Sequence, residues 1–136
     1  DPSVELPKYK TTGASGMDLM AFVRQPIKLA PNSSCLVPTG VSIAFSKDYE
    51  VQIRPRSGLA AKNNITVLNT PGTIDSDYRG EIKIILFNHG KEEFIINNKD
   101  RVAQMILSPV IKMELEEIDD LPNTLRGKDG FGSTGK

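Results

Sequence analysis

The sequence is short of several features that would assign a protein to a common class. Its 136 residues include one cysteine, one histidine and no tryptophan. A single cysteine excludes an internal disulfide and suits a reducing compartment, so we expect a cytoplasmic protein. No apolar run approaches the roughly 20 residues of a membrane span, so no membrane partner is expected. Seventeen basic residues balance seventeen acidic ones, which leaves no net charge to attract nucleic acid.

The residues that are present indicate β structure in one domain. A chain of 136 residues can bury a real core. Apolar and polar residues alternate in short runs, and turn residues separate these runs at intervals of about 8 to 12, the spacing of an all-β sandwich or barrel. The expected strands lie near residues 27–29, 36–45, 49–54, 65–68, 82–87, 94–96, 102–107 and 111–115.

One segment, residues 54–62, favours a short helix. Ser57 is a good N-cap, and the Leu-Ala-Ala-Lys run after Gly58 favours about one helical turn. Free backbone N–H groups at such a terminus, beside the Arg56 guanidinium, would make a small anion site. The alternative is a capped surface turn that binds nothing, and this segment alone favours that alternative.

Residues 68–82 concentrate reactive side chains in a bend between two apolar runs. The bend contains Asp75, Asp77 and Tyr78, and Gly72 allows a ligand to approach the backbone. Two stiff flanking strands could hold Asp75 and Tyr78 in fixed positions, as a reactive site requires. The alternative is an ordinary polar hairpin in which the two aspartates cap the turns.

The composition divides the chain into a β domain, residues 1–118, and a mobile arm, residues 119–136. Four of the eleven glycines fall in the arm, which has too few apolar residues to build a core. Phe131 could stack on a base while an arginine and two hydroxyls near it contact phosphate oxygens. The alternative is a terminus with no binding role.

Four isolated residues are also considered as functional candidates. Asp18 is either a turn cap or a carboxylate that supports a site, and Gln104 is either a bonded core amide or aimed at a site. Cys35 is best explained as a small apolar residue in a strand. His89, between Asn88 and Gly90, is best explained as a turn residue rather than a base or metal ligand.

Five segments, in order along nearly the whole chain, resemble the motifs of the trimeric dUTP diphosphatase (dUTPase) family. They are ASGMDL at 14–19, RPRSGLA at 54–60, NTPGTIDSDYRGEI at 69–82, DRVAQMI at 100–106 and RGKDGFGSTG at 126–135. The third motif looks more bacterial than animal. One departure is Asp129, where the family usually has Gly or Ser. Its negative charge near a triphosphate is expected to weaken or slow closure of the arm.

The resemblance implies a β jelly-roll homotrimer with one short helix and with active sites shared between subunits. It implies hydrolysis of dUTP to dUMP and pyrophosphate with Mg²⁺, which keeps uracil out of DNA and supplies dUMP for dTMP synthesis. Asp75 would be the general base for the water that attacks the α-phosphorus. Gln104 would contact phosphate or that water, and Asp18 would act on the metal through bound waters.

The resemblance also implies three groups of substrate-binding residues. The phosphate-binding turn would be Arg56, Ser57 and Gly58. The nucleoside pocket would be Asn69, Gly72, Thr73, Ile74, Tyr78 and Lys83, with the Tyr78 ring leaving no room for a ribose 2′-hydroxyl. The arm would close as a lid with Arg126, Phe131, Gly132, Ser133 and Thr134.

Two other functions compete with this one. A dCTP deaminase of the same fold would release ammonia from dCTP, although it is expected to lack the phenylalanine-containing arm. A non-catalytic nucleotide-binding jelly-roll module would bind a nucleotide without releasing pyrophosphate.

Overall fold

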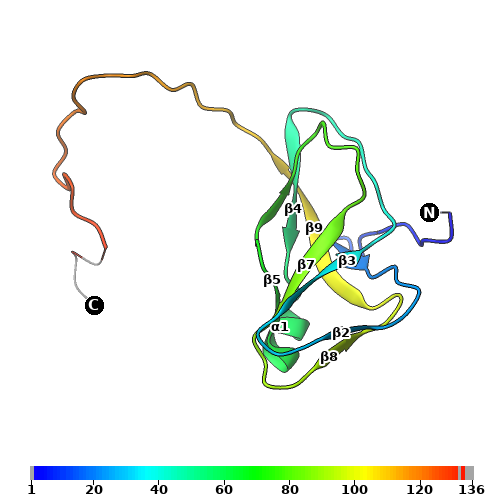
Figure 1. Ribbon diagram of the computed structural model, residues 1–136. Helices are drawn as coiled ribbons and strands as arrows, with labels where there is room; N and C mark the ends of the chain where they lie inside the picture. The colour runs from blue at the N-terminus through cyan, green and yellow to red at the C-terminus, as the bar shows by residue number, and fades with distance from the viewer. Residues whose placement is uncertain (1, 132, 134–136) are drawn as a thin grey trace.

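The computed structural model describes residues 2–131 and 133. Strands make up most of its ordered body, and the described part of the chain has one helix (Figure 1). The elements are β1 (Met17–Met20), β2 (Ile27–Leu29), β3 (Ser34–Pro38), β4 (Tyr49–Arg54), α1 (Ser57–Asn63), β5 (Ile65–Val67), β6 (Gly72–Ile74), β7 (Lys83–Asn88), β8 (Phe94–Ile96) and β9 (Arg101–Pro109). The predicted all-β fold is confirmed.

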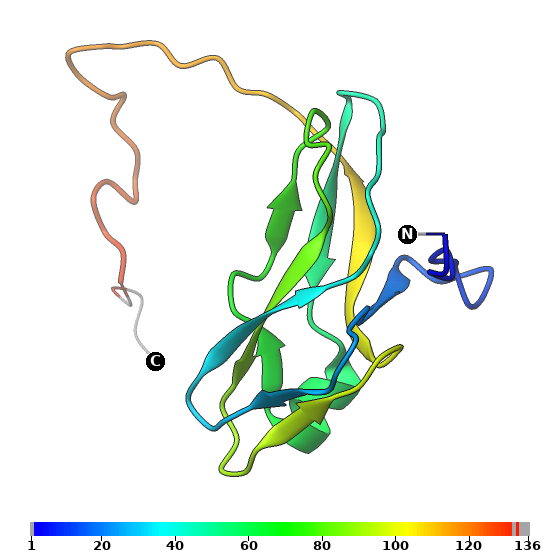
Figure 2. The same ribbon diagram turned by 45° about the vertical axis from the view of Figure 1, so that its right-hand side comes forward.

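The strands form three small antiparallel sheets that enclose one core (Figure 2). The first sheet has the order β1-β9-β4-β6, the second has the order β3-β7-β5, and β2 pairs with β8. Each sheet contributes its inward-facing residues to the same apolar cluster, for example Ile53 from β4, Leu86 from β7 and Ile96 from β8. Because strand side chains alternate between faces, the polar residues of the same strands remain on the outside.

One predicted strand is absent from the structure, and the strand predicted at residues 36–45 forms only in its first part, as β3. Residues 41–46 have no ladder partner, although Val41 is buried and its carbonyl accepts a hydrogen bond from the Ile82 N–H at 2.8 Å. Residues 111–115 alternate as a strand should, but they leave the barrel, and Ile111 and Met113 are 95% and 81% exposed. The alternation was therefore insufficient, because a strand also needs a neighbour to pair with.

The N-cap of the helix lies one residue earlier in the sequence than predicted. Ser57 is the first helical residue and Arg56, with extended backbone angles, is the N-cap, so the prediction of Ser57 as N-cap is wrong. The Arg56 carbonyl accepts the Ala60 N–H at 3.1 Å, and no side chain caps the helix. Among the described residues, no helix has the length and apolar character needed to cross a membrane.

The chain beyond β9 runs away from the barrel in both views (Figures 1 and 2). Residues 110–131 contain no strand or helix. Leu121 and Leu125, which could have packed on the barrel, are fully or almost fully exposed. By contrast, Cys35 on β3 is half-buried, and that burial raises the pKa of its thiol, which agrees with its reading as an apolar strand residue.

Candidate active site

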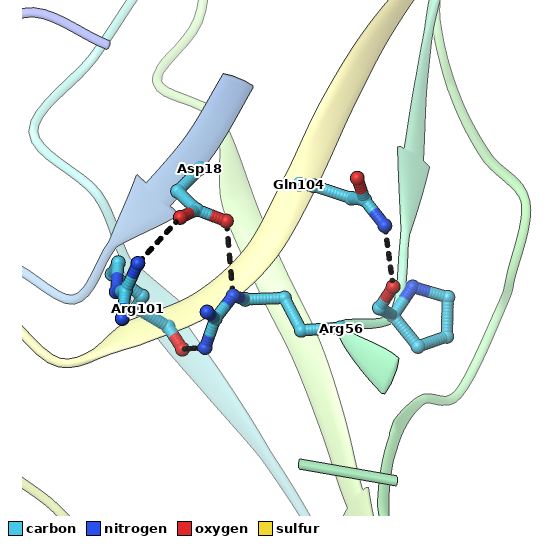
Figure 3. A network of polar contacts seen from close by, with 5 residues as sticks. Asp18, Arg56, Arg101 and Gln104 are labelled. Atoms are coloured by element: carbon cyan, nitrogen blue, oxygen red, sulfur yellow. Dashed lines mark hydrogen bonds and ion pairs between the residues drawn. The ribbon is translucent and has the colours of Figure 1, made fainter. Parts of the chain in front are cut away.

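Three charged side chains and one amide lie together on β1, β9 and the start of α1. We call this group the guanidinium cluster (Asp18, Arg56, Arg101 and Gln104). Arg56 Nε donates to Asp18 Oδ1 at 2.9 Å, and Arg101 Nη1 donates to Asp18 Oδ2 at 3.1 Å. Arg56 also donates through Nη1 to the Arg101 carbonyl at 3.1 Å. Figure 3 shows the carboxylate held between the two guanidinium groups.

Strand register brings these residues together although they are far apart in the sequence. Asp18 on β1 lies opposite Gln104 on β9, and Gln104 lies opposite Arg54 on β4. Gln104 Nε2 donates to the Pro55 carbonyl at 3.0 Å, which ties β9 to the turn before α1 (Figure 3). Asp18 is therefore a strand residue and not a turn cap, and the Gln104 amide is bonded to the phosphate-binding turn that the resemblance implies.

Gly16 makes room for this arrangement. A Cβ at Gly16 would lie 2.9 Å from Gln104 Oε1 and 3.3 Å from the Met105 carbonyl oxygen, closer than side chains ordinarily pack. Gly16 of the first motif therefore leaves the space that the Gln104 side chain of the fourth motif occupies. Without a side chain at Gly16, the Gln104 amide has room to lie against Pro55.

The cluster is suited to an anion. Its two guanidinium groups and one carboxylate leave a net charge of +1 on partly buried side chains. A Cβ at Gly58 would meet no atom within 4 Å, so the backbone beside Arg56 faces open space. A guanidinium binds two phosphate oxygens in its fork, and exposed backbone N–H groups can bind a third.

A separate cleft of about 570 Å³ lies between the second sheet and the bend after β6, and we call it the nucleoside cleft. Its volume is in the range of small-molecule sites. Its lining combines apolar side chains, one aromatic ring and charged groups: Leu36, Thr73, Ile74, Asp75, Tyr78, Gly80, Glu81 and Lys83.

The bend itself holds Tyr78 in the cleft through its backbone and its hydroxyl. The Tyr78 N–H donates to the Asp75 carbonyl at 3.1 Å, and Tyr78 Oη donates to the Glu81 carbonyl at 2.9 Å. The ring covers Gly80, where a Cβ would lie 2.5 Å from Tyr78 Cζ. The bend therefore fixes both ends of the tyrosine, which a side chain at position 80 would displace.

Asn69 lies at the other end of the same bend. Its Nδ2 would lie 3.2 Å from a Cβ at Gly72, so the amide packs directly on the glycine backbone. The Thr70–Pro71 peptide bond between them is cis. Gly72 begins β6 and pairs with Ile53, which attaches this part of the bend to the first sheet.

The predicted site residues form two groups within one chain, not one. Ile74 lies opposite Val51, whereas Gln104 lies opposite Arg54, and three residues along β4 correspond to roughly 10 Å. In the described part of the chain, no hydrogen bond or ion pair joins the guanidinium cluster to the nucleoside cleft.

The described arm residues join neither group. Arg126 Nε donates to the Asp129 carbonyl at 2.9 Å, the Ser133 N–H donates to the Gly130 carbonyl at 3.1 Å, and Phe131 is exposed. The remaining arm residues predicted to bind substrate, Gly132 and Thr134, lie outside the described residues.

Sequence reasoning missed three residues that the structure adds to these groups. Arg101 holds the second oxygen of Asp18, and its place in the fourth motif was the available signal. Leu36, an apolar residue 55% exposed on β3, lines the nucleoside cleft. Glu81 lines the same cleft and contacts Gly40, 41 residues earlier, for which the sequence has no local signal.

The donor set fits magnesium only through water or substrate oxygens. Among the described residues, no three His, Cys, Asp or Glu side chains lie close enough together to hold a metal ion. Asp18 is a single carboxylate whose two oxygens already accept from guanidinium groups. Mg²⁺ commonly keeps several waters and binds through substrate phosphates and one or two carboxylates, so this arrangement is compatible with it.

The fold and the two groups of residues define an all-β protein with two candidate sites, a basic cluster and a cleft that contains an aromatic ring and a carboxylate. The dUTPase family profile matches residues 3–135. The chain therefore belongs to the dUTPase family.

Curated relatives agree with this membership. The chain is 54% identical over 130 residues to the deoxyuridine 5′-triphosphate nucleotidohydrolase of Treponema denticola, covering 96% of this chain and 90% of that protein. It is 52% identical over 132 residues to the protein of the same name from Bdellovibrio bacteriovorus, covering 97% and 89%. Both relatives are bacterial, as the third motif indicated.

Solved structures share the fold at low sequence identity. A mutant dUTPase of Staphylococcus bacteriophage 80alpha with dUpNHpp superposes with a TM-score of 0.82 at 20% identity, over 98% of this chain and 93% of that one. A mutant dUTPase from phage phi11 of S. aureus, described with a structural Mg(II) ion, has a TM-score of 0.76 at 20% identity, over 86% and 91%.

Proposed function

We propose that this chain hydrolyses dUTP to dUMP and pyrophosphate by attack of water on the α-phosphorus. The observation that carries the proposal is the nucleoside cleft, in which one bend places the Asp75 carboxylate and the bonded Tyr78 ring together. The relatives named for this activity, at about half identity over nearly the whole chain, support it. The reaction would keep uracil out of DNA and supply dUMP for dTMP synthesis.

Asp75 is the general base in this proposal. Its exposed carboxylate stands at the end of β6 on the edge of the cleft, where a water can be held against the substrate. A positioned base contributes roughly 10²- to 10⁴-fold to such a step, and fixing the reactants in place contributes more. The proton passes from the water to the Asp75 carboxylate as the bond from oxygen to the α-phosphorus forms. The bond from the α-phosphorus to the bridging oxygen breaks, and pyrophosphate leaves.

The bend selects deoxyuridine. Asn69 and the backbone of Gly72, Thr73 and Ile74 bond the polar edge of uracil, so cytosine would leave buried donors and acceptors unpaired. The Tyr78 ring lies against the deoxyribose and excludes a 2′-hydroxyl. The Lys83 ammonium lines the same cleft and contacts the nucleotide.

The guanidinium cluster binds the triphosphate. Arg56, Ser57 and the Gly58 backbone hold phosphate oxygens, and Gln104 contacts a phosphate oxygen or the attacking water. Magnesium bound to the triphosphate would neutralise part of its charge. Asp18, whose two carboxylate oxygens accept from Arg56 and Arg101, would act on that ion through bound waters.

A homotrimer completes the site. Within one chain the cluster and the cleft are separated along β4, which supports a site in which the cluster of one copy serves the cleft of a neighbour. The arm closes over the bound nucleotide, with Phe131 on the base and with Arg126, Ser133 and Thr134 on the γ-phosphate beside Gly132. We place the enzyme in the cytoplasm, with no nucleic acid or membrane partner.

The deciding experiment is pyrophosphate release from dUTP compared with dTTP, dCTP and UTP, with magnesium supplied. We expect release from dUTP to be at least about a hundredfold faster than from dCTP, since mispaired polar groups in a pocket discriminate strongly. Release from dTTP and UTP should also be slower, because the pocket must exclude the thymine methyl group and the Tyr78 ring the ribose 2′-hydroxyl. Ammonia release from dCTP would instead indicate the deaminase. Binding of dUTP without pyrophosphate release would indicate the non-catalytic module.

A further inference from the structure

One wall of the nucleoside cleft is attached to the barrel by a short turn, residues 39–41, which we call the anchor turn. Thr39 Oγ1 donates to the Ile82 carbonyl at 2.6 Å, and the Ile82 N–H donates to the Val41 carbonyl at 2.8 Å. Thr39 and Ile82 are 1% and 0% exposed, so both bonds are shielded from water. The backbone at Ile82 is therefore a fixed point beside the cleft.

Glu81, the residue before Ile82, makes contacts around the cleft through three of its oxygen atoms. Its Oε1 accepts the Gly40 N–H at 2.8 Å, and its Oε2 lies 3.9 Å from Lys83 Nζ. Its carbonyl accepts the Tyr78 hydroxyl at 2.9 Å. One residue thus joins the anchor turn, the tyrosine ring and the lysine ammonium.

Gly40 allows the anchor turn to present its N–H to Glu81. Its φ is +69°, a conformation that side-chain-bearing residues rarely adopt. A Cβ there would also lie 2.5 Å from Val4 Cγ2 and 3.1 Å from Phe22 Cδ1. The direction of this N–H is therefore set by a glycine that has no room for a side chain.

We infer that Glu81 is a positioning residue for the nucleotide, and this inference rests on the proposed function. Its carboxylate, bound to the anchor turn, holds the Lys83 ammonium at the cleft and keeps the Glu81 carbonyl under the Tyr78 hydroxyl. Glu81 touches no reacting atom. It fixes the ring that faces the sugar and the cation that contacts the nucleotide.

A carboxylate suits both contacts better than an amide does. A carboxylate has two accepting oxygens and a negative charge, whereas glutamine has one accepting oxygen and an NH₂ group that would repel an ammonium. Glu81→Gln should therefore keep the bond to Gly40 and lose the attraction to Lys83. Glu81→Ala should lose both, which makes the two variants separable.

The first test is steady-state hydrolysis of dUTP and UTP by the full-length chain and its variants. For Glu81→Ala we expect KM for dUTP to rise about tenfold and the preference for dUTP over UTP to fall about tenfold, with kcat within about twofold, since a charge-assisted bond is worth roughly that factor. Glu81→Gln should raise KM less and retain the sugar preference. Glu93→Ala, an exposed glutamate far from the cleft, is the matched control.

The second test does not depend on turnover. Hydrogen exchange at the Gly40 amide, followed by NMR, should accelerate about tenfold in Glu81→Ala and stay near the wild-type rate in Glu81→Gln. Affinity for dUMP, measured on the same samples, should fall only in variants that lose the contact of Glu81 with Lys83 or with Tyr78.

The two tests separate failure of the inference from failure of the proposed function. An unchanged KM and unchanged sugar preference in a folded Glu81→Ala protein would overturn the inference, as would unchanged Gly40 exchange. Equal losses of kcat in both variants would also overturn it, because a positioning role predicts a change in KM. A wild-type chain that leaves dUTP intact would contradict the proposed function. The rate of hydrogen exchange at Gly40 and the affinity for dUMP would still decide the role of Glu81 in that case.

Discussion

The guanidinium cluster and the C-terminal arm bind the same triphosphate in our proposal, yet they are built in opposite ways. In the cluster, Asp18 and Arg56 are 38 residues apart and are joined at 2.9 Å by strands that fold without the substrate. In the arm, the hydrogen bonds of Arg126 among the described residues are both to the backbone of Asp129, three residues away, and Phe131 is exposed. Folding therefore orders the first region, whereas in our proposal the bound nucleotide orders the second.

This difference separates two kinds of contribution to the reaction. A group placed by the barrel is ready before the substrate arrives, and its loss removes chemistry or binding directly. A group placed by the arm costs conformational entropy each time it closes, and its benefit is the exclusion of water from a completed site. The predictions below test each side of that contrast, from the largest expected effect to the smallest.

Asp75→Asn tests the barrel side at its chemical centre. We expect kcat to fall by about 10³-fold, because amide oxygen cannot take the proton that a positioned carboxylate takes. Affinity for dUMP and the melting temperature should stay unchanged, since Asp75 is exposed and its side chain makes no hydrogen bond in the described structure. Asp77→Asn, two residues along the same bend, is the control, and near-normal turnover by Asp75→Asn would remove Asp75 as the base.

Deletion of the residues after Leu125 tests the arm side. We expect kcat/KM for dUTP to fall about a hundredfold, the size of losing donors that stabilise charge in the transition state. Calorimetry should give the same melting temperature as the full chain, because residues 119–131 make no contact that the barrel needs. A truncated chain with full activity would exclude the lid role.

Arg101→Ala breaks the cluster without removing a residue assigned to the substrate. Asp18 would keep its bond to Arg56 and lose the one from Arg101 Nη1 at 3.1 Å. Since Arg101 is about half exposed, solvent screening limits its effect, and we expect kcat/KM to fall about fivefold. Arg101→Lys should recover part of the loss, and equal activity in all three proteins would show that Arg56 alone positions Asp18.

Asp129→Gly sharpens the arm side and has the smallest expected effect. Removing one exposed negative charge near a bound triphosphate should raise kcat/KM about twofold at low salt, with the gain shrinking at high salt. The Arg126 bond should survive, because it uses the Asp129 backbone carbonyl. A gain that does not depend on ionic strength would point to backbone flexibility rather than charge.

The parts of the candidate site that could be predicted from the sequence are those whose residues are close together in the sequence. Asp75 and Tyr78 belong to one bend, and Arg56, Ser57 and Gly58 to one turn, so each set could be recognised from neighbouring letters. Arg101 and Glu81 could not be assigned in this way. Their partners, Asp18 and Gly40, lie 83 and 41 residues away, and only strand register brings them close.

The fold shows the same division. Alternation correctly indicated β4 and β7, and a short apolar run correctly indicated β8. It was wrong for residues 111–115, which carry the same pattern but extend away from the barrel. A residue pattern states which face of a strand is apolar, and it does not state whether a second strand is available to pair with it.

The sequence by itself determined the all-β class, the dUTPase family and the side chains that can do the chemistry, because these depend on residue type and short spacing. Tertiary structure alone decided that Asp18 sits between two arginines, that Glu81 is bound to the anchor turn, and that the cluster and the cleft lie apart within one chain. Those features depend on which strands become neighbours and in what register, and many residues distant in sequence set that choice together.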